Sequence, residues 1–574
     1  MPPRRGSPRV LAVARGDEPA DLLLKGGSVF VPGTREWVPT DLAIVNGTIA
    51  GWGPREARET VDVSGAALTA AFVDVHMHLE STKLWVDEFV RVVLPHGTTA
   101  VAADPHEIAN VFGVPGIVAL AEASGRLPFT FGISAPSCVP ASHFESPAAE
   151  ISSAELTELL DEHGAIGIAE FMDFPGVVSG DPEVLARIAT AGHKRVDGHA
   201  PGVRGRQLDA YLAAGIESDH ECTDLEEAEE KRRKGMWIFI REGSASRNLA
   251  ALIETVLRHG TDRIALCTDD REPDTLLHSG HVNDCVRLAV AAGVSTEDAL
   301  VMATSNPADY HHFDHLGWLA PGYQADVLCF DDLSGFEPAR VWQAGKLVAT
   351  NGTIVPGAVP NVDAPDWMRA SVHLDNPPAP GAFDFSPPAG GRARVIGIQS
   401  RSLTTRDLVL DVTDPSAQVA RIAVVERHRR TGRIGLGYVH GFGLTHGAIA
   451  STVAHDAHNC MVVGALHESG PMEMAVAVAR LAEIGGGQVA VRDGRVLAEV
   501  RLPIGGLMSD QGIEEVAREV RLLADAASNG RGVTIDSPFM QLSFLGLSVL
   551  PELRITDKGL VDVMKFVLTD LAAT

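Results

Sequence analysis

The chain of 574 residues has few cysteines, few aromatic residues and no long apolar segment. Its six cysteines are scattered without a CxxC pair, which disfavours a zinc ribbon or a disulfide framework and is typical of reduced, structural cysteine. Aromatic residues make up only 5%, which disfavours a protein that stacks single-stranded bases. No apolar run reaches the roughly 18 residues of a membrane span, and the first residues lack the apolar stretch of a signal peptide. We therefore expect a cytoplasmic protein with no membrane partner.

Basic residues are outnumbered by acidic ones, 48 against 75, which gives a formal net charge of −27. Such an excess of negative charge disfavours binding to nucleic acid or to an anionic membrane, and leaves a small neutral or cationic ligand open. Apolar residues at 45% and charged residues at 21% are ordinary for a globular protein. The length predicts several domains, or only two if one of them is a large barrel.

Two strand-rich pieces flank a long middle segment. Residues 20–63 and 325–352 both show short alternating strands with glycine turns, which predicts one β-sandwich domain made from residues 1–68 and 308–355. In residues 69–307 eight short apolar strand candidates alternate with helix-length stretches, as in a (β/α)₈ barrel. The eight candidates are FVDVHMH, TTAVAAD, FTFGISA, AIGIAE, RVDGHA, GIESDHE, MWIFIRE and RIALCTD.

A proline-rich linker is expected at residues 356–393, because eight prolines lie between Pro356 and Pro388. Residues 394–574 mix strand patterns such as VAVRDGRVLAEVRL with helical patterns such as GIEEVAREVRLLADAA, which predicts a further α/β domain. The predicted fold class is therefore α/β: a (β/α)₈ barrel, a split β-sandwich and an additional C-terminal α/β domain.

The first candidate site is the pair His76 and His78 at the end of the first predicted barrel strand. Residues two apart on a strand point to the same face, so both imidazoles could reach one metal ion. Since about one HxH pair is expected by chance among 22 histidines, the pair could equally be two unrelated residues.

Other predicted strands end in residues of the same kind: Glu170, His199, His220 and Asp269. Catalytic residues of (β/α)₈ barrels gather at the carboxyl ends of the strands, so these side chains are expected to meet His76 and His78. Nitrogen and oxygen donors without thiolates suit zinc, manganese or iron(II). Six ligands exceed one tetrahedral site, and a carboxylate such as Glu170 could bridge two ions.

Three further clusters allow two interpretations each. Asp104 and His106, after the second strand, belong either to a turn with a helix cap or to the rim of the site. The stretch Arg241 to Ser246 either caps a helix or lines the pocket. In the C-terminal segment, a set of polar residues forms either a buried hydrogen-bond network or part of a pocket: His440, His455, Asp456 and His458.

Several long motifs resemble those of bacterial adenine deaminase, in the amidohydrolase superfamily. They are HMHLEST, GTTAVAADPHEIANVFG, GHAPGVRGRQLDAYLAAGIESDHECT, IREGSASRNL and CTDDREPDTLLHSGHVND, with TGRIGLGYVHGFGL, ASTVAHDAHNCMVVG and LPIGGLMSDQ in the C-terminal segment. The resemblance extends from about Asp21 to the end of the chain.

This resemblance implies hydrolysis of adenine to hypoxanthine and ammonia, through attack on C6 by a hydroxide that bridges two divalent metals. The metals would be manganese or iron, with zinc as a third option. The implied ligands are His76, His78, Glu170, His199, His220 and Asp269. Asp269 would shuttle the proton, Glu80 is a candidate proton donor near N1, and Asp104 and His106 are candidates for an extra metal or for substrate contact. The resemblance also suggests a homodimer.

Other functions remain open at this point. The same metal site could act on an N6-substituted adenine or on a cyclic amide, and the chain could instead be a non-catalytic scaffold that has kept the fold. The complete set of six predicted ligands argues against the scaffold.

Overall fold

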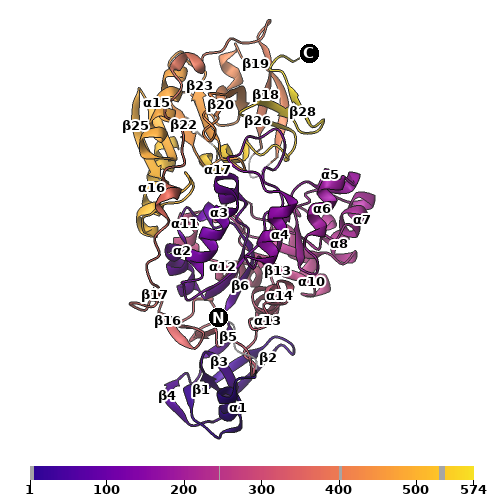
Figure 1. Ribbon diagram of the computed structural model, residues 1–574, viewed down its shortest axis with the longest axis vertical. Helices are drawn as coiled ribbons and strands as arrows, with labels where there is room; N and C mark the ends of the chain where they lie inside the picture. The colour runs from indigo at the N-terminus through magenta and orange to yellow at the C-terminus, as the bar shows by residue number, and fades with distance from the viewer. Residues whose placement is uncertain (1–5, 245, 400–403, 529–534, 536, 574) are drawn as a thin grey trace.

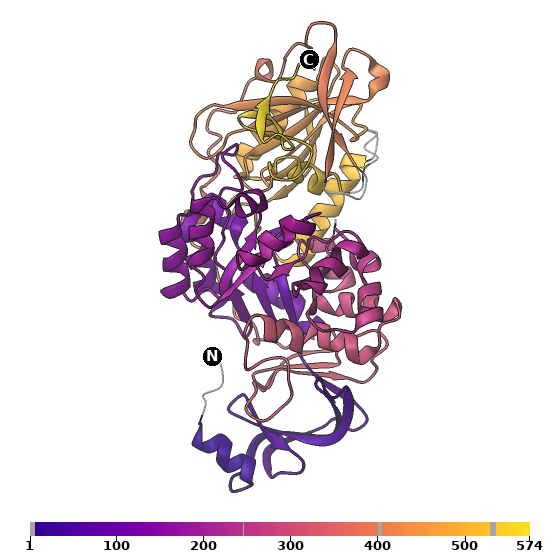
Figure 2. The ribbon, with the colours of Figure 1, turned by 90° about the vertical axis from the view of Figure 1, so that its right-hand side faces the viewer.

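The computed structural model describes residues 6–244, 246–399, 404–528, 535 and 537–573. The molecule is elongated, with three regions stacked along its longest axis (Figures 1 and 2). The N-terminal strands lie at one end, a region of alternating strands and helices lies in the middle, and the C-terminal sheet lies at the other end.

The two strand-rich pieces meet in one nine-stranded sheet of order β17-β16-β15-β14-β5-β1-β2-β3, with β4 paired to β1. The antiparallel pairing of β5 with β14, in which Ala70 lies opposite Val327, joins the pieces. Helix α1 (Pro8–Arg15) contributes Val13 to a small apolar cluster of this sheet. The strands are β1 (Ala20–Val31), β2 (Glu36–Val45), β3 (Thr48–Trp52), β4 (Ala57–Asp62), β5 (Ala67–Ala70), β14 (Val327–Phe330), β15 (Arg340–Gln343), β16 (Lys346–Thr350) and β17 (Thr353–Ile354).

Each of the eight predicted strand segments of the middle region contains a strand. These are β6 (Phe72–Met77), β7 (Thr98–Ala103), β8 (Thr130–Ile133), β9 (Gly167–Phe171), β10 (Arg195–Gly198), β11 (Ser218–Asp219), β12 (Trp237–Arg241) and β13 (Ile264–Cys267). They form three parallel sheets, β6-β7-β8, β9-β10 and β11-β12-β13. Isolated parallel bridges link Ala135 to Ile168 and Met77 to Asp269, so the described residues contain no continuous eight-stranded ladder.

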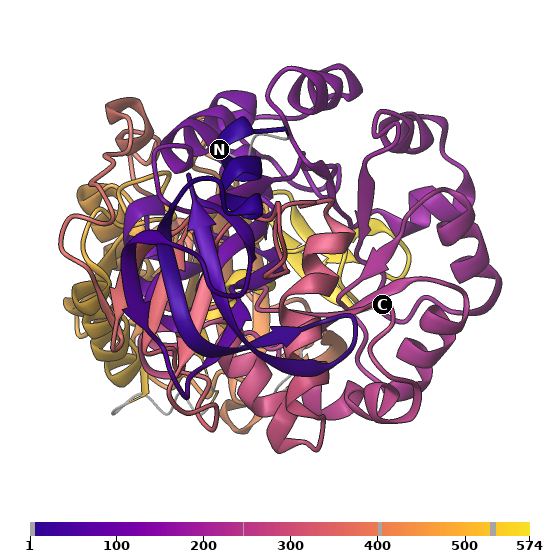
Figure 3. The same cartoon turned by 90° about the horizontal axis from the view of Figure 1, so that it is seen from below.

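Helices surround these strands, as the view along the long axis shows (Figure 3). The strands are almost entirely buried, which explains their unbroken apolar sequences. The helices are α2 (Val86–Val93), α3 (His106–Ser124), α4 (Ser153–Asp161), α5 (Phe174–Ser179), α6 (Pro182–Ala189), α7 (Gly205–Ala213), α8 (Leu225–Arg233), α9 (Leu249–Leu252), α10 (Glu254–His259), α11 (Pro273–Ser279), α12 (Val282–Ala291), α13 (Thr296–Ala303) and α14 (Ser305–Tyr310), with short 3₁₀ helices η1 (Glu80–Thr82) and η2 (Leu94–His96).

Helix α3 is long and apolar enough, by length and composition alone, to cross a membrane. Its sequence is not an unbroken apolar run, since it includes His106, Glu107 and Asn110. Its apolar window is 61% buried inside the protein, and the backbone is non-helical at Gly113.

The C-terminal region is an eight-stranded sheet of order β19-β18-β21-β20-β23-β22-β24-β25 together with a small sheet β26-β27-β28. Before it, residues 356–391 hold only two short 3₁₀ helices, η3 (Asp366–Arg369) and η4 (Pro380–Ala382), as the proline content predicts. Its elements are β18 (Arg392–Ile398), β19 (Thr405–Asp411), η5 (Pro415–Ala417), β20 (Val419–Val425), β21 (Ile434–His440), β22 (Ala448–Ser451), β23 (Cys460–Ala465), α15 (Gly470–Ile484), β24 (Gly487–Arg492), β25 (Arg495–Arg501), α16 (Ile513–Ser528), α17 (Pro538–Phe544), β26 (Leu553–Thr556), β27 (Gly559–Asp562) and β28 (Val567–Thr569).

The C-terminal region is docked on the middle region through buried polar contacts. The Asn459 side-chain amide donates to the carbonyl oxygen of Ser146 at 3.1 Å, and the Ser146 hydroxyl donates to Asp557 at 2.9 Å. The backbone N–H of Ser548 donates to the Glu145 carboxylate at 3.2 Å. Residues 453–459 and α17 are therefore held against the loop that follows β8.

Lys231 of α8 is a fully buried cation that organises two neighbouring strand ends. Its ammonium donates to the Ala200 carbonyl at 2.6 Å, to Asp219 at 3.0 Å and to Glu227 at 2.7 Å. Asp219 also accepts from the Ala200 backbone N–H at 2.8 Å. Because Ala200 follows His199 and Asp219 precedes His220, this network fixes the backbone beside two predicted metal ligands.

We expect Lys231→Met to lower the free energy of unfolding by about 3–5 kcal/mol, because it leaves two buried carboxylates without their cation. Urea denaturation followed by circular dichroism measures this loss. Lys234→Met, at the partly exposed end of the same helix, is the matched control and should cost less than about 1 kcal/mol. Equal losses in the two variants would show that the buried network does not stabilise this region.

Candidate metal centre

The six predicted ligands meet at the carboxyl ends of five strands. His76 lies on β6 and His78 just beyond it, and Glu170 lies on β9. His199 and His220 directly follow β10 and β11, and Asp269 is the second residue after β13. All six are buried: the relative exposures are His76 2%, His78 3%, Glu170 4%, His199 7%, His220 2% and Asp269 3%. The alternation of side chains along β6 brings both of its histidines to one side, as the sequence predicts.

Glu170 lies at the centre of this cluster, and its two oxygens face different histidines. Oε2 is 2.6 Å from His199 Nδ1 and 3.2 Å from His220 Nε2. Oε1 is 3.5 Å from His78 Nε2 and 3.6 Å from His106 Nδ1. This carboxylate is therefore positioned to serve two ions at once.

Asp269 completes the side of the cluster near β6. Its Oδ1 is 3.2 Å from His78 Nε2 and 3.5 Å from His76 Nε2. Its backbone has a φ of +53°, in the left-handed region that a non-glycine residue rarely adopts. The strained conformation turns the carboxylate toward the histidines instead of along the strand.

The donor set fits divalent metal ions. Ligand atoms bonded to one ion at about 2.0–2.2 Å lie about 3.3–3.6 Å apart in a tetrahedral site. The separations around Glu170 and Asp269 are close to this range, except for the 2.6 Å between Glu170 Oε2 and His199 Nδ1. His78 Nδ1 is 3.1 Å from the Asp104 carbonyl oxygen, so Nδ1 carries the hydrogen and Nε2 offers its lone pair. Within this cluster, three buried ring nitrogens have no hydrogen-bond partner among the described residues: His76 Nε2, His106 Nδ1 and His199 Nε2.

Arg241, at the end of β12, sets the charge state of two carboxylates. It donates to Asp269 Oδ2 at 2.8 Å and holds both oxygens of Glu221. Burial alone would raise the pKa of Asp269, but Arg241 and the neighbouring histidines hold it well below its usual value. The pKa of Glu221 is lowered too: burial would raise it, but Arg241, His199 and His220 together outweigh that effect. Both groups are therefore ionised at neutral pH.

The segment that contains Asp104 and His106 fits both predicted interpretations, a turn before a helix and the rim of the site. Asp104 Oδ1 accepts from the backbone N–H of His106 at 3.0 Å, as in a turn. Its Oδ2 lies 3.2 Å from His106 Nδ1, and that nitrogen also faces Glu170. The pair therefore belongs to the rim of the cluster and can contribute further ligand atoms.

A small cavity opens onto the cluster and is lined by both the middle and the C-terminal regions. His455 and Asp456 line it from the loop after β22, and the ring of His455 stacks on Phe544 of α17 at 4.3 Å between centroids. The lining residues are His78, His106, Glu170, Met172, His199, His220, Glu221, Arg241, Asp269, Asp270, His455, Asp456, Phe544, Leu547 and Leu550.

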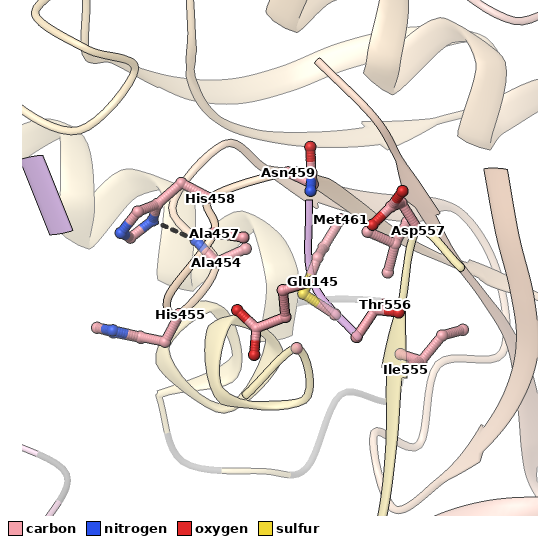
Figure 4. A pocket seen from close by; sticks show the side chains of 12 residues that line it. Glu145, Ala454, His455, Ala457, His458, Asn459, Met461, Ile555, Thr556 and Asp557 are labelled. Atoms are coloured by element: carbon pink, nitrogen blue, oxygen red, sulfur yellow. Dashed lines mark hydrogen bonds between the residues drawn. The ribbon is translucent and has the colours of Figure 1, made fainter. Parts of the chain in front are cut away.

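His458 and His440 do not line this cavity. His458 faces a second, smaller cavity behind the loop, beside Glu145 (Figure 4). Its Nδ1 accepts from the Ala454 backbone N–H at 3.1 Å, so its Nε2 carries the hydrogen and points toward Glu107 at 3.6 Å. That tautomer makes Nε2 a donor, unsuited to a metal. His440 is half-buried at the end of β21, with Nδ1 3.0 Å from the Ala417 carbonyl oxygen.

Glu80 is also absent from the cavity lining. Its Oε1 accepts from the backbone N–H of Ile108 at 2.9 Å, in the first turn of α3. Burial raises its pKa. In the structure Oε1 of this side chain binds the first turn of α3, Oε2 has no hydrogen-bond partner among the described residues, and the predicted contact with a substrate stays a prediction.

The sequence analysis missed several lining residues. Glu221 and Asp270 directly follow predicted ligands in the chain, and that adjacency was the signal that could have found them. Arg241 belongs to the stretch 241–246, which was predicted either to cap a helix or to line the pocket, and its side chain lines the cavity. Ser244 instead accepts from the Glu272 backbone N–H at 2.9 Å, and Ala245 lies outside the described residues. Met172, Phe544, Leu547 and Leu550 carried no local signal.

Comparisons with known proteins match both halves of the chain. The model of the amidohydrolase family matches residues 67–348, and that of the adenine deaminase C-terminal domain matches residues 399–567. The chain is 44% identical to adenine deaminase 2 of Carboxydothermus hydrogenoformans over 566 residues, which cover 97% of this chain and 98% of the relative. It is 43% identical to adenine deaminase of Desulfatibacillum aliphaticivorans, again covering 97% and 98% of the two chains.

A solved structure of an adenosine deaminase from Xanthomonas campestris with bound zinc matches with a TM-score of 0.45 and 18% identity. The match covers 59% of this chain and 95% of that one.

Proposed function

The chain belongs to the adenine deaminase family of the amidohydrolase superfamily, and on that premise we propose that it hydrolyses adenine to hypoxanthine and ammonia. The observation that carries the proposal is the convergence of four histidines and two carboxylates in one buried cluster, in a chain related over almost its full length to adenine deaminases. The enzyme is a hydrolase that depends on metal.

Two divalent ions, manganese or iron(II) with zinc as a third option, suit the donor set. His76, His78 and Asp269 would hold one ion, His199 and His220 the other, and Glu170 would bridge them. Asp104 and His106 are candidates for an additional ion or for substrate contact. Such ions lower the pKa of a bound water to about 7 and so supply a nucleophile at neutral pH.

The carboxylate of Asp269 is the proton carrier in this proposal. It is ionised in the resting enzyme, so it can take a proton from the attacking water. It then returns the proton to the N6 amino group, which leaves C6 as ammonia. Arg241 holds Oδ2 of this carboxylate and keeps it oriented toward the reacting centre.

The remaining lining suits a flat, compact base. Met172, Leu547 and Leu550 offer apolar contact to the faces of a purine ring, and His455 and Asp456 offer polar atoms to its edge. The exclusion of bulk water by this buried lining strengthens every electrostatic contact within it.

Finer points of architecture belong to the same proposal. The three parallel sheets would be arcs of one (β/α)₈ barrel, which the two isolated bridges support. The domains would be residues 1–68 with 308–355, residues 69–307, a linker at 356–393 and residues 394–574. A homodimer in the cytoplasm remains a prediction.

We expect the protein purified with manganese or iron(II) to carry about two metals per chain, because six nitrogen and oxygen ligands exceed one site. Elemental analysis of an active preparation measures this. His440→Ala removes a histidine outside the cavity and should keep both metals, whereas His199→Ala should lose one. An active preparation with one metal or none would contradict the two-metal centre.

Asp269→Asn should keep the fold and lower kcat by several orders of magnitude, since general acid–base catalysis alone is worth roughly 10²–10⁴. The measurement is ammonia release at saturating adenine, with circular dichroism and metal content as checks. Asp262→Asn, an exposed carboxylate just before β13, serves as control and should keep normal turnover. Near-normal turnover of Asp269→Asn with metal bound would remove this residue from the mechanism.

Free adenine should be accepted and adenosine rejected by 10⁴-fold or more in kcat/KM, because a ribose at N9 would leave several buried polar groups unpaired. Ammonia release from adenine, adenosine, N6-methyladenine, guanine and cytosine at matched concentration tests this. Comparable kcat/KM values for adenine and adenosine would refute the idea that the pocket excludes a ribose at N9. A preference for N6-methyladenine would make an N6-substituted adenine the substrate.

A further inference from the structure

The carboxylates that line the cavity differ in whether all their oxygens have hydrogen-bond partners. Five of them line it: Glu170, Glu221, Asp269, Asp270 and Asp456. Among them, within the described residues, only Asp456 has a fully buried side-chain oxygen with no hydrogen-bond partner, namely Oδ2. The residue is 1% exposed, so bulk water does not solvate this oxygen. A buried acceptor of this kind needs a donor from a ligand.

We propose that Asp456 recognises the ring N–H on the imidazole half of the purine and thereby selects free bases over N9-substituted ones. This inference rests on the proposed deamination of adenine and adds to it the residue that sets substrate form. It assigns to the C-terminal region a direct part in specificity.

Adenine chemistry leaves one donor for this oxygen. The neutral base has N–H groups at the N6 amino group and at one nitrogen of the imidazole ring. The amino group must lie at the metal ligands, because it is the group displaced there. The other end of the base then presents its ring N–H, and the matching acceptor has to lie on the far side of the cavity.

Asp456 lies on that far side. His106 stands between it and the bridging carboxylate, with Nδ1 3.6 Å from Glu170 Oε1 and Nε2 3.5 Å from Asp456 Oδ1. The ring of His106 thus spans the gap from the metal ligands to Asp456. Apart from the ring of His455, the neighbouring lining on the C-terminal side is aromatic or aliphatic, from Phe544 and Leu547, and Asp456 supplies the only carboxylate there among the described residues.

The loop that carries Asp456 is held from both sides. The Asn459 side chain binds the Ser146 carbonyl oxygen, and His455 N–H donates to the Ser543 carbonyl oxygen at 3.0 Å. Figure 4 shows the loop with Ala454 bonded to His458 across its turn. Because the loop is fixed before a ligand arrives, a substituent on the ring nitrogen meets a rigid carboxylate instead of a yielding surface.

The test compares adenine, 9-methyladenine and 7-deazaadenine, which retains its N9–H, in the metal-loaded enzyme. The wild type should prefer adenine to 9-methyladenine at least 100-fold. In Asp456→Ala the kcat/KM for adenine and for 7-deazaadenine should fall about 10- to 100-fold, mainly through KM, while that for 9-methyladenine stays within threefold or rises. Asp456→Asn, whose amide oxygen can still accept, should lose less.

A binding measurement separates recognition from turnover. Calorimetric titration should show that Asp456→Ala weakens the binding of hypoxanthine by the same factor as that of adenine. The binding of 9-methylhypoxanthine should be unchanged. Glu468→Ala removes an exposed carboxylate at the other end of β23 and is the matched control, with wild-type values throughout. Equal losses for the methylated and unmethylated bases, or no loss at all, would overturn the assignment. Absence of ammonia release from adenine by the wild type would instead overturn the proposed function.

Discussion

The shared carboxylate of Glu170 is the constraint on which the site depends. Its two oxygens face histidines from different strands, so β6, β10 and β11 must all reach it in one register. A shift of one residue along any of these strands would turn its ligand to the opposite face. The buried parallel strands and their covering helices therefore serve, above all, to place one carboxylate among imidazoles. The free-energy cost of removing this charge from water is offset by its contacts with the histidine rings, and bound metals would offset it further.

Two buried cations, Lys231 and Arg241, bind different carboxylates close to this centre. Lys231 fixes the backbone next to His199 and His220 through Asp219, without reaching the cavity. Arg241 acts from the cavity wall and joins Asp269 to Glu221. Each cation balances two carboxylates, so the negative charge needed for metal binding is confined to defined positions. The net charge of −27 of the whole chain is thus a poor guide to the balance within the site.

The convergence of the six predicted ligands could be foreseen from the sequence because the signal is local: each residue lies at or just after the end of a strand, and strand ends of a parallel sheet meet at one edge. Residues whose position depends on tertiary docking could not be predicted in this way. Phe544 of α17 and Leu547 just after it reach the cavity because the C-terminal region is docked on the middle region, and no sequence pattern predicts that contact. Proximity along the chain does not settle the position of Glu80, which is close to His78 in sequence but whose Oε1 binds the first turn of α3. Of the C-terminal histidines, His455 reaches the cavity, whereas His440 bonds to its own domain.

The order of these residues along the chain has a consequence for assembly. All six ligands are present once residue 269 has been synthesised, whereas His455, Asp456 and Phe544 follow much later. Domains generally fold as units and from the N-terminus during synthesis. The predicted ligands are therefore synthesised well before the residues that close the cavity from the C-terminal side. In this order of synthesis, the residues that would bind metal come first, and those that give the pocket its shape for a base come last.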